Sequence, residues 1–270
     1  IKSLAHDGVK EITLLGQNVN AYHGLIGDGT NNELSLGQLI YHIAAINGVE
    51  RIRYTTSHPR DLALDLMLAH RDVSELMPFL HLPVQSGSDK MLNAMNRRHT
   101  SQDYCDKVRE LRRIRPDIAI SSDFIVGFPG ETDDDFNETM NLVEHIEFAQ
   151  AFSFKYSERP GTPAAENKDQ VPEKIKRSRL LKLQQALSFS QEKFNAQMVG
   201  KTVPILFERF GHEAGYLIGR TPYGQWVQTE LSRDYLGCCI DVLITSAQKS
   251  SLRGSVVKKS LTISNEEYVA

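Results

Sequence analysis

The sequence predicts an α/β protein in which a parallel sheet, in barrel or open form, is followed by a small antiparallel β-barrel. Apolar, β-branched runs alternate with helical patterns roughly every 30–40 residues up to residue 156, which is typical of βαβ units. After residue 200 the helical patterns give way to short β runs and Gly/Pro turns, which are typical of a small barrel.

The first part of the chain is expected to contain five parallel strands and the helices between them. The expected strands are residues 11–15, 51–56, 78–82, 118–126 and 149–156. The expected helices are residues 36–46, 62–70, 89–115 and 133–146. The long helical region 89–115 is interrupted near Thr100, and Thr100 or Ser101 is expected to cap its second part.

The second part begins with a helix over residues 172–197, which starts at a proline. The short strands of the β-barrel are expected at residues 202–208, 215–219, 225–229, 239–246 and 252–258. The predicted domains are residues 1–170 (α/β), 171–197 (a basic linker helix), 198–260 (the β-barrel) and 261–270 (a tail). The first residues look like the end of a helix that stops at Gly8, so we expect the chain to begin within a longer protein.

The composition is that of an ordinary globular protein. Hydrophobic residues make up 40% and charged residues 24%, which excludes disordered, collagen-like and disulfide-scaffold classes. No apolar stretch approaches the ~20 residues that span a bilayer, so we expect no transmembrane helix and no membrane partner. Three cysteines suit a reducing compartment, and a cytoplasmic location is expected.

The charges are unevenly distributed along the chain. Residues 1–170 hold 17 basic and 25 acidic side chains, whereas residues 171–270 hold 14 basic and 9 acidic ones. A basic C-terminal third on an acidic body indicates contact with a polyanion such as nucleic acid. An ordinary solvated surface is the alternative interpretation.

Polar residues follow each of the five expected parallel strands. Because the carboxyl ends of parallel strands face the ligand in such folds, we expect these residues to line one binding site. The alternative is that loops after strands are polar in any case. Asp123, in an otherwise buried strand, is expected to face a polar cavity or to pair with a base such as Arg97, because an unpartnered buried carboxylate is costly.

No catalytic or metal-binding motif is found in the sequence. Cys105, Cys238 and Cys239 do not form a C-x-x-C or C-x3-C-x-x-C pattern, so we expect no metal ligands. The chain also lacks a nucleophile elbow, a P-loop and an H-E-x-x-H motif. The sequence therefore predicts no catalytic side chain.

Five segments together resemble the radical-SAM tRNA methylthiotransferases of the MiaB type. They are LLGQNVNAY at 14–22, YTTSHP at 54–59, LHLPVQSGS at 80–88, SSDFIVGFPGE at 121–131 and FKYSERPGTP at 154–163. The resemblance implies a partial (β/α)6 radical-SAM barrel with strands two to six, followed by a TRAM barrel. It also implies that the N-terminal domain, the first barrel strand and the cluster-binding cysteines lie outside this chain.

The resemblance implies an activity for the full-length protein. S-adenosylmethionine and [4Fe-4S] clusters would serve to add a methylthio group at C2 of N6-isopentenyladenosine beside the tRNA anticodon. The partners implied are the anticodon stem-loop of tRNA and the missing N-terminal part of the same protein. The chain alone is expected to be inactive, because the cluster ligands are absent from it.

The resemblance also implies two sets of binding residues. The residues expected to contact S-adenosylmethionine are Gln17, Asn18, Ser57, His58, Gln85, Ser86, Arg97, Asp123, Ile125, Gly127 and Tyr156. Within this set, the methionine moiety is expected near Gln17 and Asn18 and the ribose near Gln85 and Ser86, with Tyr156 beside the adenine. The residues expected to contact RNA are Lys174, Lys176, Arg177, Arg179, Lys249, Arg253, Lys258 and Lys259. Tyr216 and Tyr223 could stack on bases, and packing is favoured for Trp226.

Three alternative functions remain open at this point. The chain could be a tRNA-binding module without catalysis, or part of a methylthiotransferase that acts on another modified adenosine. It could also be an unrelated α/β-barrel enzyme with a small-molecule substrate. Salt-dependent tRNA binding without turnover would favour the first, and ligand binding without RNA affinity would favour the last.

Overall fold

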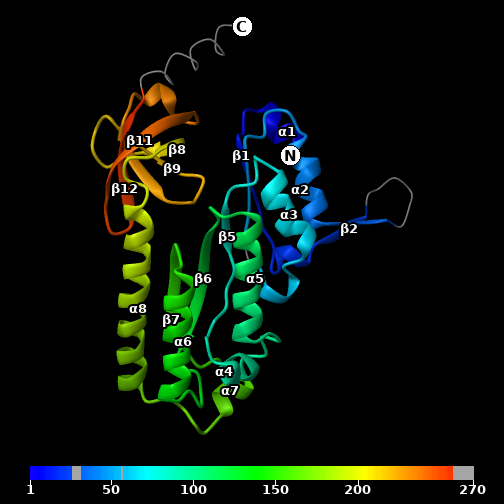
Figure 1. The fold of residues 1–270 in the computed structure, drawn as a ribbon, viewed down its shortest axis with the longest axis vertical. Coiled ribbons are helices and arrows are strands. Elements are labelled where there is room, and N and C mark those ends of the chain that lie inside the picture. The colour runs from blue at the N-terminus through cyan, green and yellow to red at the C-terminus, as the bar shows by residue number, and fades with distance from the viewer. Residues whose placement is uncertain (26–31, 56, 258–270) are drawn as a thin grey trace. The chain divides into compact units, whose positions relative to one another are not determined.

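The computed structural model describes residues 1–25, 32–55 and 57–257 of the 270-residue chain. The chain divides into two compact units, residues 1–187 (unit 1) and residues 188–270 (unit 2). The division falls within helix α8 (Glu173–Ala196), between Leu187 and Ser188 (Figure 1). Each unit has its own hydrophobic core and is described separately below.

Unit 1 is built on parallel strands, as predicted. The five strands lie where the sequence placed them: β1 (Glu11–Leu14), β4 (Arg51–Tyr54), β5 (Phe79–His81), β6 (Ala119–Val126) and β7 (Gln150–Lys155). β1 pairs with β4, and β6 pairs with both β5 and β7, in each case in parallel. A single parallel bridge between Ile52 and Leu76 links β4 to the segment before β5. The described strands therefore follow one another in chain order, as in part of a βα barrel.

The helices of unit 1 alternate with these strands (Figure 1). They are α1 (Lys2–His6), α2 (Leu36–Ala44), α3 (Leu64–Asp72), α4 (Asp89–Ala94), α5 (Ser101–Ile114), α6 (Asp133–Ile146) and α7 (Pro163–Glu166). Thr100 caps α5 with a capping box, which confirms the predicted break in residues 89–115. Thr132 caps α6 in the same way, and Asp135 supplies the reciprocal bond.

The core of unit 1 lies between one face of the parallel strands and the helices. On β6 the side chains of Ile120, Phe124 and Val126 are fully buried, whereas Asp123 and Ile125 on the opposite face are only half-buried. This alternation follows from the two-residue period of a strand. The second face of the sheet is therefore partly exposed to solvent and carries the polar side chain of Asp123.

A short hairpin in unit 1 was not predicted. β2 (His23–Leu25) pairs antiparallel with β3 (Glu33–Ser35), between the expected strand 11–15 and the expected helix 36–46, where no strand was expected. Each strand has three residues, and neither carries the β-branched apolar run by which the longer strands are recognised.

Unit 2 contains a closed five-stranded barrel in the order β10-β12-β11-β8-β9. Its strands are β8 (Thr202–Phe210), β9 (Tyr216–Arg220), β10 (Trp226–Glu230), β11 (Cys239–Ala247) and β12 (Ser251–Val256). Four of the five strand pairs in the described barrel are antiparallel, as expected, but β10 and β12 pair in parallel. β12 is the last strand in the sequence, but it lies between β10 and β11 in the barrel. It pairs with both of them and so closes the ring.

No helix in the described ranges is both long and apolar enough to cross a lipid bilayer.

Candidate functional site

Charged side chains lie on one face of the strands β1 and β4. Ile52 and Tyr54 of β4 are buried in the core, so Arg51 and Arg53 point to the opposite face. Arg53 Nε lies 3.1 Å from Glu11 Oε1 on β1, and Arg51 Nη1 lies 3.9 Å from the other oxygen of the same carboxylate. The alternation Arg–Ile–Arg–Tyr at residues 51–54 could have been used to predict this charged face from the sequence.

The polar face of β6 carries a histidine–aspartate pair with β5. His81 Nε2 lies 3.4 Å from Asp123 Oδ2, and His81 Nδ1 lies 3.1 Å from Ser121 Oγ. The parallel register sets His81 opposite Ser121, which makes Asp123 its diagonal neighbour. Asp123 thus pairs with His81. Arg97, the base that the sequence suggested, donates its guanidinium to the carbonyl of Pro83 at 2.8 Å. Burial lowers the pKa of Arg97, and the charge of Asp123 opposes this change.

A cavity of about 660 Å³ opens at the carboxyl ends of β6 and β7. Four residues that were expected to contact the cofactor line it: Gln85, Asp123, Ile125 and Tyr156. The rings of Phe128 and Phe154 add apolar walls. An apolar cavity with a few convergent polar groups is the usual form of a small-molecule site. We name it the strand-end cavity.

The backbone at Gln85 is in the left-handed region, with φ at +79°. This conformation costs a residue other than glycine roughly 1–2 kcal/mol. The Gln85 N–H donates to the carbonyl of Asp123, and its carbonyl accepts from the N–H of Ile125, both at 2.9 Å. These two bonds hold the strained residue against β6, at the edge of the strand-end cavity. Strain of this kind is concentrated at binding sites.

Two substitutions test the strain at Gln85. Gln85→Gly and Gln85→Ala both remove the side chain, but only glycine adopts a positive φ without cost. We expect the glycine variant to be more stable than the alanine variant by about 1 kcal/mol in a urea titration followed by circular dichroism. An alanine variant of equal or greater stability would contradict the prediction.

Tyr156 lines the strand-end cavity and carries an unpaired polar atom. Its hydroxyl is buried and has no hydrogen-bond partner among the described residues. Its ring packs edge-on against Phe128, with the centroids 5.0 Å apart, and Lys176 Nζ lies 5.1 Å from the ring centroid. A buried hydroxyl without a partner costs free energy, and a bound ligand could remove this cost.

The turn after β6 requires a glycine at position 127. Gly127 has a φ of +71°, and its N–H donates to Glu131 Oε2 at 2.7 Å. A Cβ atom at this position would lie 2.4 Å from Cγ of Lys176. Gly127 was expected to contact the cofactor, and in the structure its close neighbour is the side chain of Lys176 from α8.

The carboxylate of Glu131 is neutralised by Arg179, which also comes from α8. Arg179 Nη1 lies 2.6 Å from Glu131 Oε2, and Arg179 Nη2 lies 2.7 Å from Asp133 Oδ1. The side chains of Arg179 and Glu131 are 7% and 1% exposed. Burial raises the pKa of Glu131, whereas the bond from Gly127 and the charge of Arg179 oppose this rise. The pair therefore fixes the turn after β6 to α8.

These contacts correct two of the predicted RNA contacts. Lys176 and Arg179 are each only 6% exposed, because both belong to the face of α8 that packs in unit 1. Buried in this way, they cannot contact phosphates. Four others are exposed, as an RNA contact would require: Lys174, Arg177, Lys249 and Arg253. Lys258 and Lys259 lie outside the described residues.

Four predicted cofactor residues follow β1 and β4 and do not line the strand-end cavity: Gln17, Asn18, Ser57 and His58. Gln17 is exposed, and Asn18 Nδ2 donates to Asp61 Oδ2 at 2.6 Å. The Ser57 hydroxyl is buried and has no partner within the described ranges. Their role as cofactor contacts stays a prediction.

Ser86, which was expected beside the ribose, is not among the residues that line the strand-end cavity. Ser86 is completely buried, and its hydroxyl lies 3.2 Å from the hydroxyl of Thr139 on α6. The neighbouring Gly87 N–H donates to the same Thr139 oxygen at 3.0 Å. Ser86 therefore fastens the loop to α6 rather than facing a ligand.

Aromatic and basic side chains combine on the barrel of unit 2. The half-buried Trp226 ring has the guanidinium of Arg209 at 4.2 Å and that of Arg220 at 5.4 Å from its centroid. Tyr216 and Arg253 line a groove of about 610 Å³. Bases of single-stranded RNA stack on aromatic rings and guanidinium planes, and both kinds of group are present here, with Arg220 also paired with Glu208 at 2.8 Å. The sequence interpretation did not include the two arginines.

A metal site is not formed by the residues that the structure describes. Within them, no three His, Cys, Asp or Glu side chains gather closely enough to hold a metal ion. Cys105 lies in unit 1, and Cys238 and Cys239 lie in unit 2. An iron–sulfur cluster held by several thiolates does not fit this arrangement.

The parallel strands with polar carboxyl ends are those of an α/β protein that binds a ligand at one edge of its sheet. Residues 1–143 match the Radical SAM superfamily, and the chain belongs to it. Residues 196–257 match the TRAM domain. Both matches confirm the resemblance and the fold class indicated by the sequence motifs.

Curated relatives make the comparison more specific. A tRNA-2-methylthio-N(6)-dimethylallyladenosine synthase of Wolbachia pipientis subsp. Culex pipiens (strain wPip) is 55% identical over 254 residues, which cover 93% of this chain and 57% of the relative. The protein of the same name from Ehrlichia ruminantium (strain Gardel) is 52% identical over 255 residues, covering 94% and 57%. This chain thus spans little more than half the length of these relatives.

Proposed function

We propose that this chain is part of a tRNA methylthiotransferase, which adds a methylthio group at C2 of an N6-isopentenyladenosine next to the anticodon. The observation that carries the proposal is the identity of 52–55% over at least 93% of the chain to relatives named for this product. In this proposal unit 1 binds S-adenosylmethionine and unit 2 binds the tRNA.

The strand-end cavity has the chemistry that S-adenosylmethionine needs. The rings of Phe128 and Phe154 would flank the adenine, and the carboxylate of Asp123 could accept hydrogen bonds from ribose hydroxyls or the ammonium group. The buried Tyr156 hydroxyl, which has no partner in the described part of the chain, could bond a polar atom of the ligand.

In this superfamily, S-adenosylmethionine and an iron–sulfur cluster together supply the radical chemistry, and the protein supplies binding, orientation and exclusion of water. The described residues offer no ligand set for the cluster, so no step is assigned to it. In this proposal the chain itself binds the nucleoside part of S-adenosylmethionine and places the RNA next to that cofactor.

Calorimetric titration of the purified chain with S-adenosylmethionine tests the cofactor site. We expect binding to one site, and Tyr156→Phe is expected to weaken it roughly five- to tenfold, because the buried hydroxyl loses a ligand bond. Tyr41→Phe removes a hydroxyl from an exposed tyrosine on α2 that bonds Asp72 at 3.0 Å, so it should leave the affinity unchanged.

The same experiments separate the alternatives. RNA binding without S-adenosylmethionine binding would favour a tRNA-binding module without catalysis. The reverse result would favour an enzyme with a small-molecule substrate. If the chain binds an anticodon stem-loop equally well with and without the N6-isopentenyl group, the experiment gives no support for N6-isopentenyladenosine as the target.

A further inference from the structure

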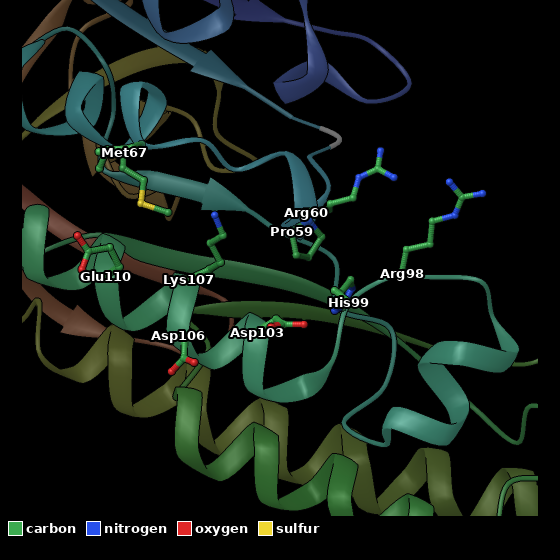
Figure 2. A pocket seen from close by; sticks show the side chains of 10 residues that line it. Pro59, Arg60, Met67, Arg98, His99, Asp103, Asp106, Lys107 and Glu110 are labelled. Carbon is green, nitrogen blue, oxygen red and sulfur yellow. The ribbon is translucent and has the colours of Figure 1, made fainter.

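Unit 1 carries a group of basic side chains outside the strand-end cavity. Arg60 lies in the 3-10 turn Pro59–Asp61 after β4, and Arg97 and Arg98 lie in the loop between α4 and α5. The two segments meet where the rings of His58 and His99 pack edge-on, with their centroids 5.5 Å apart. Figure 2 shows the Arg60 and Arg98 side chains extending in the same direction beyond His99. We call the three arginines the basic rim.

The positive charge of the basic rim is compensated only in part. Arg60 donates to both carboxylate oxygens of Asp61, at 3.0 and 3.4 Å, and the charge of Asp123 acts on Arg97. The exposed Arg98 has no ion-pair partner among the described residues. Arg97 bonds a backbone carbonyl, and its Nε has no partner in that part of the chain. Burial, with the charges of Arg97 and His99, lowers the pKa of His58 to about 4, so His58 is neutral at pH 7.

The acidic side chains near the basic rim are engaged elsewhere. Arg60 and Arg98 line a cavity of about 430 Å³ together with Asp103, Asp106 and Glu110 (Figure 2). Asp103 accepts from the N–H of Thr100, whereas Asp106 and Glu110 form ion pairs with Arg109 and Arg113 at 2.5 and 2.8 Å. These carboxylates are thus bonded within α5 and its cap, although Asp103 keeps its negative charge, which acts on His99 beside the rim.

The loop that presents Arg98 is held in an unfavourable backbone conformation. Arg98 has a φ of +55°, which a long side chain rarely adopts, and Asn96 has the same φ directly after α4, where asparagine commonly ends a helix. The Arg97 N–H donates to the carbonyl of Leu92 at 2.9 Å, which closes the end of α4. Like charges are thus brought together on a fixed loop, at a cost that an anionic ligand could offset.

We propose that the basic rim binds phosphates of the RNA backbone and so holds the target nucleotide at unit 1. Both rim segments follow strands of the parallel sheet, β4 and β5, so they lie at the same strand ends as the strand-end cavity. An enzyme that acts on one base needs its neighbouring phosphates fixed close to the reacting position. This inference rests on the proposed function, because it takes the substrate to be RNA.

The test is the affinity of the full 270-residue chain for a synthetic anticodon stem-loop RNA, measured by fluorescence anisotropy at several salt concentrations. The double variant Arg60→Gln/Arg98→Gln is expected to bind about tenfold more weakly at about 0.1 M salt. The slope of log K against log salt should fall by about 1 to 2, roughly one unit for each phosphate that the variant no longer neutralises.

The double variant Arg109→Gln/Arg113→Gln is the matched control. It removes the same net charge from exposed arginines of the same unit that lie on α5, outside the two rim segments, and are paired with carboxylates of that helix. We expect its affinity to stay within about twofold of the unchanged protein, because surface pairs of this kind are energetically small.

The outcomes are distinguishable. Equal losses in both double variants would show an effect of net charge alone and overturn the proposal, as would an unchanged affinity and salt slope in the rim variant. If the unchanged protein does not bind the RNA at all, the proposed function fails together with this inference. Competition by polyglutamate as strong as that by RNA would show a general anion surface and also overturn it.

Discussion

Replacing Arg179 with methionine is expected to destabilise unit 1 by about 3 to 5 kcal/mol, the usual cost of removing one partner from a buried ion pair. Methionine keeps much of the side-chain volume but leaves the carboxylate of Glu131 buried without its counter-charge. Hydrogen–deuterium exchange of peptides covering residues 125–135, together with urea titration, measures the loss. Faster exchange is expected first at the turn around Gly127, whose N–H bonds the same carboxylate.

Two further variants show whether the charge is responsible. Arg179→Met/Glu131→Gln removes both charges while keeping an oxygen that can accept from Gly127, and it should recover most of the lost stability. Arg177→Met removes an exposed arginine that is paired with Glu173 at 3.1 Å, and a change below about 0.5 kcal/mol is expected. If the double variant is as unstable as Arg179→Met, the loss comes from packing and not from the unpaired charge.

Lowering the pH from 6.5 to near 4.5 is expected to cost the protein about 2 to 3 kcal/mol through His70. His70 is completely buried, and its Nε2 lies 2.8 Å from the hydroxyl of Tyr54. Burial, with a smaller contribution from Arg115, lowers its pKa to about 3. The unfolded chain takes up a proton at this histidine near pH 6.5, so stability is complete above that pH and falls below it.

Urea titrations at several pH values measure this loss. His70→Gln keeps a polar group near Tyr54 but cannot titrate. The free energy of unfolding of this variant should therefore fall less steeply with pH than that of the unchanged protein, and the two slopes should differ by roughly 1.4 kcal/mol per pH unit. His58, whose pKa is lowered to about 4, accounts for a remaining slope. His42→Gln, at an exposed position on α2, should keep the original pH dependence, and an identical slope in His70→Gln would contradict the prediction.

The elements of the fold could be predicted where local signals and burial agree. The strand 119–126 has apolar residues at both ends of a short polar stretch, with Phe-Ile-Val closing it, and α5 and α6 begin at threonines with an acid three residues later. The β2–β3 hairpin was missed because its three-residue strands depend on their pairing and not on their own composition.

The errors in the candidate sites share one cause: residue type was taken as a guide to exposure. Lys176 and Arg179 are basic and lie on a long helix, so they were assigned to RNA, yet they occupy the helical face that also carries Leu183 and Leu187. Their spacing of three and four residues from that apolar stripe is the signal that indicates burial. The partner Glu131 lies 48 residues away and cannot be identified from local sequence.

Predicted cofactor residues on β6 and after β5 and β7 gather at one cavity, whereas those after β1 and β4 do not line it. Asp123 and Tyr156 belong to the parallel pair β6–β7 and its end, and a parallel bridge joins Gln85 to Phe124 of β6. Their contact with a cofactor stays a prediction. Whether Gln17 and Ser57 contribute to the same ligand depends on the loops that follow their strands, and loop conformation is not fixed by strand position.

The parallel pairing of β12 with β10 has a consequence for biosynthesis. The strand that completes the ring of unit 2 is also the last one to be translated, so β8, β9 and β10 leave the ribosome as an unfinished meander. Unit 1 can fold earlier, whereas the barrel of unit 2 cannot close before residues 251–256, which form β12, have been synthesised. A nascent polypeptide halted just before them would present open edges of β10 and β11 to chaperones or to other unfinished chains.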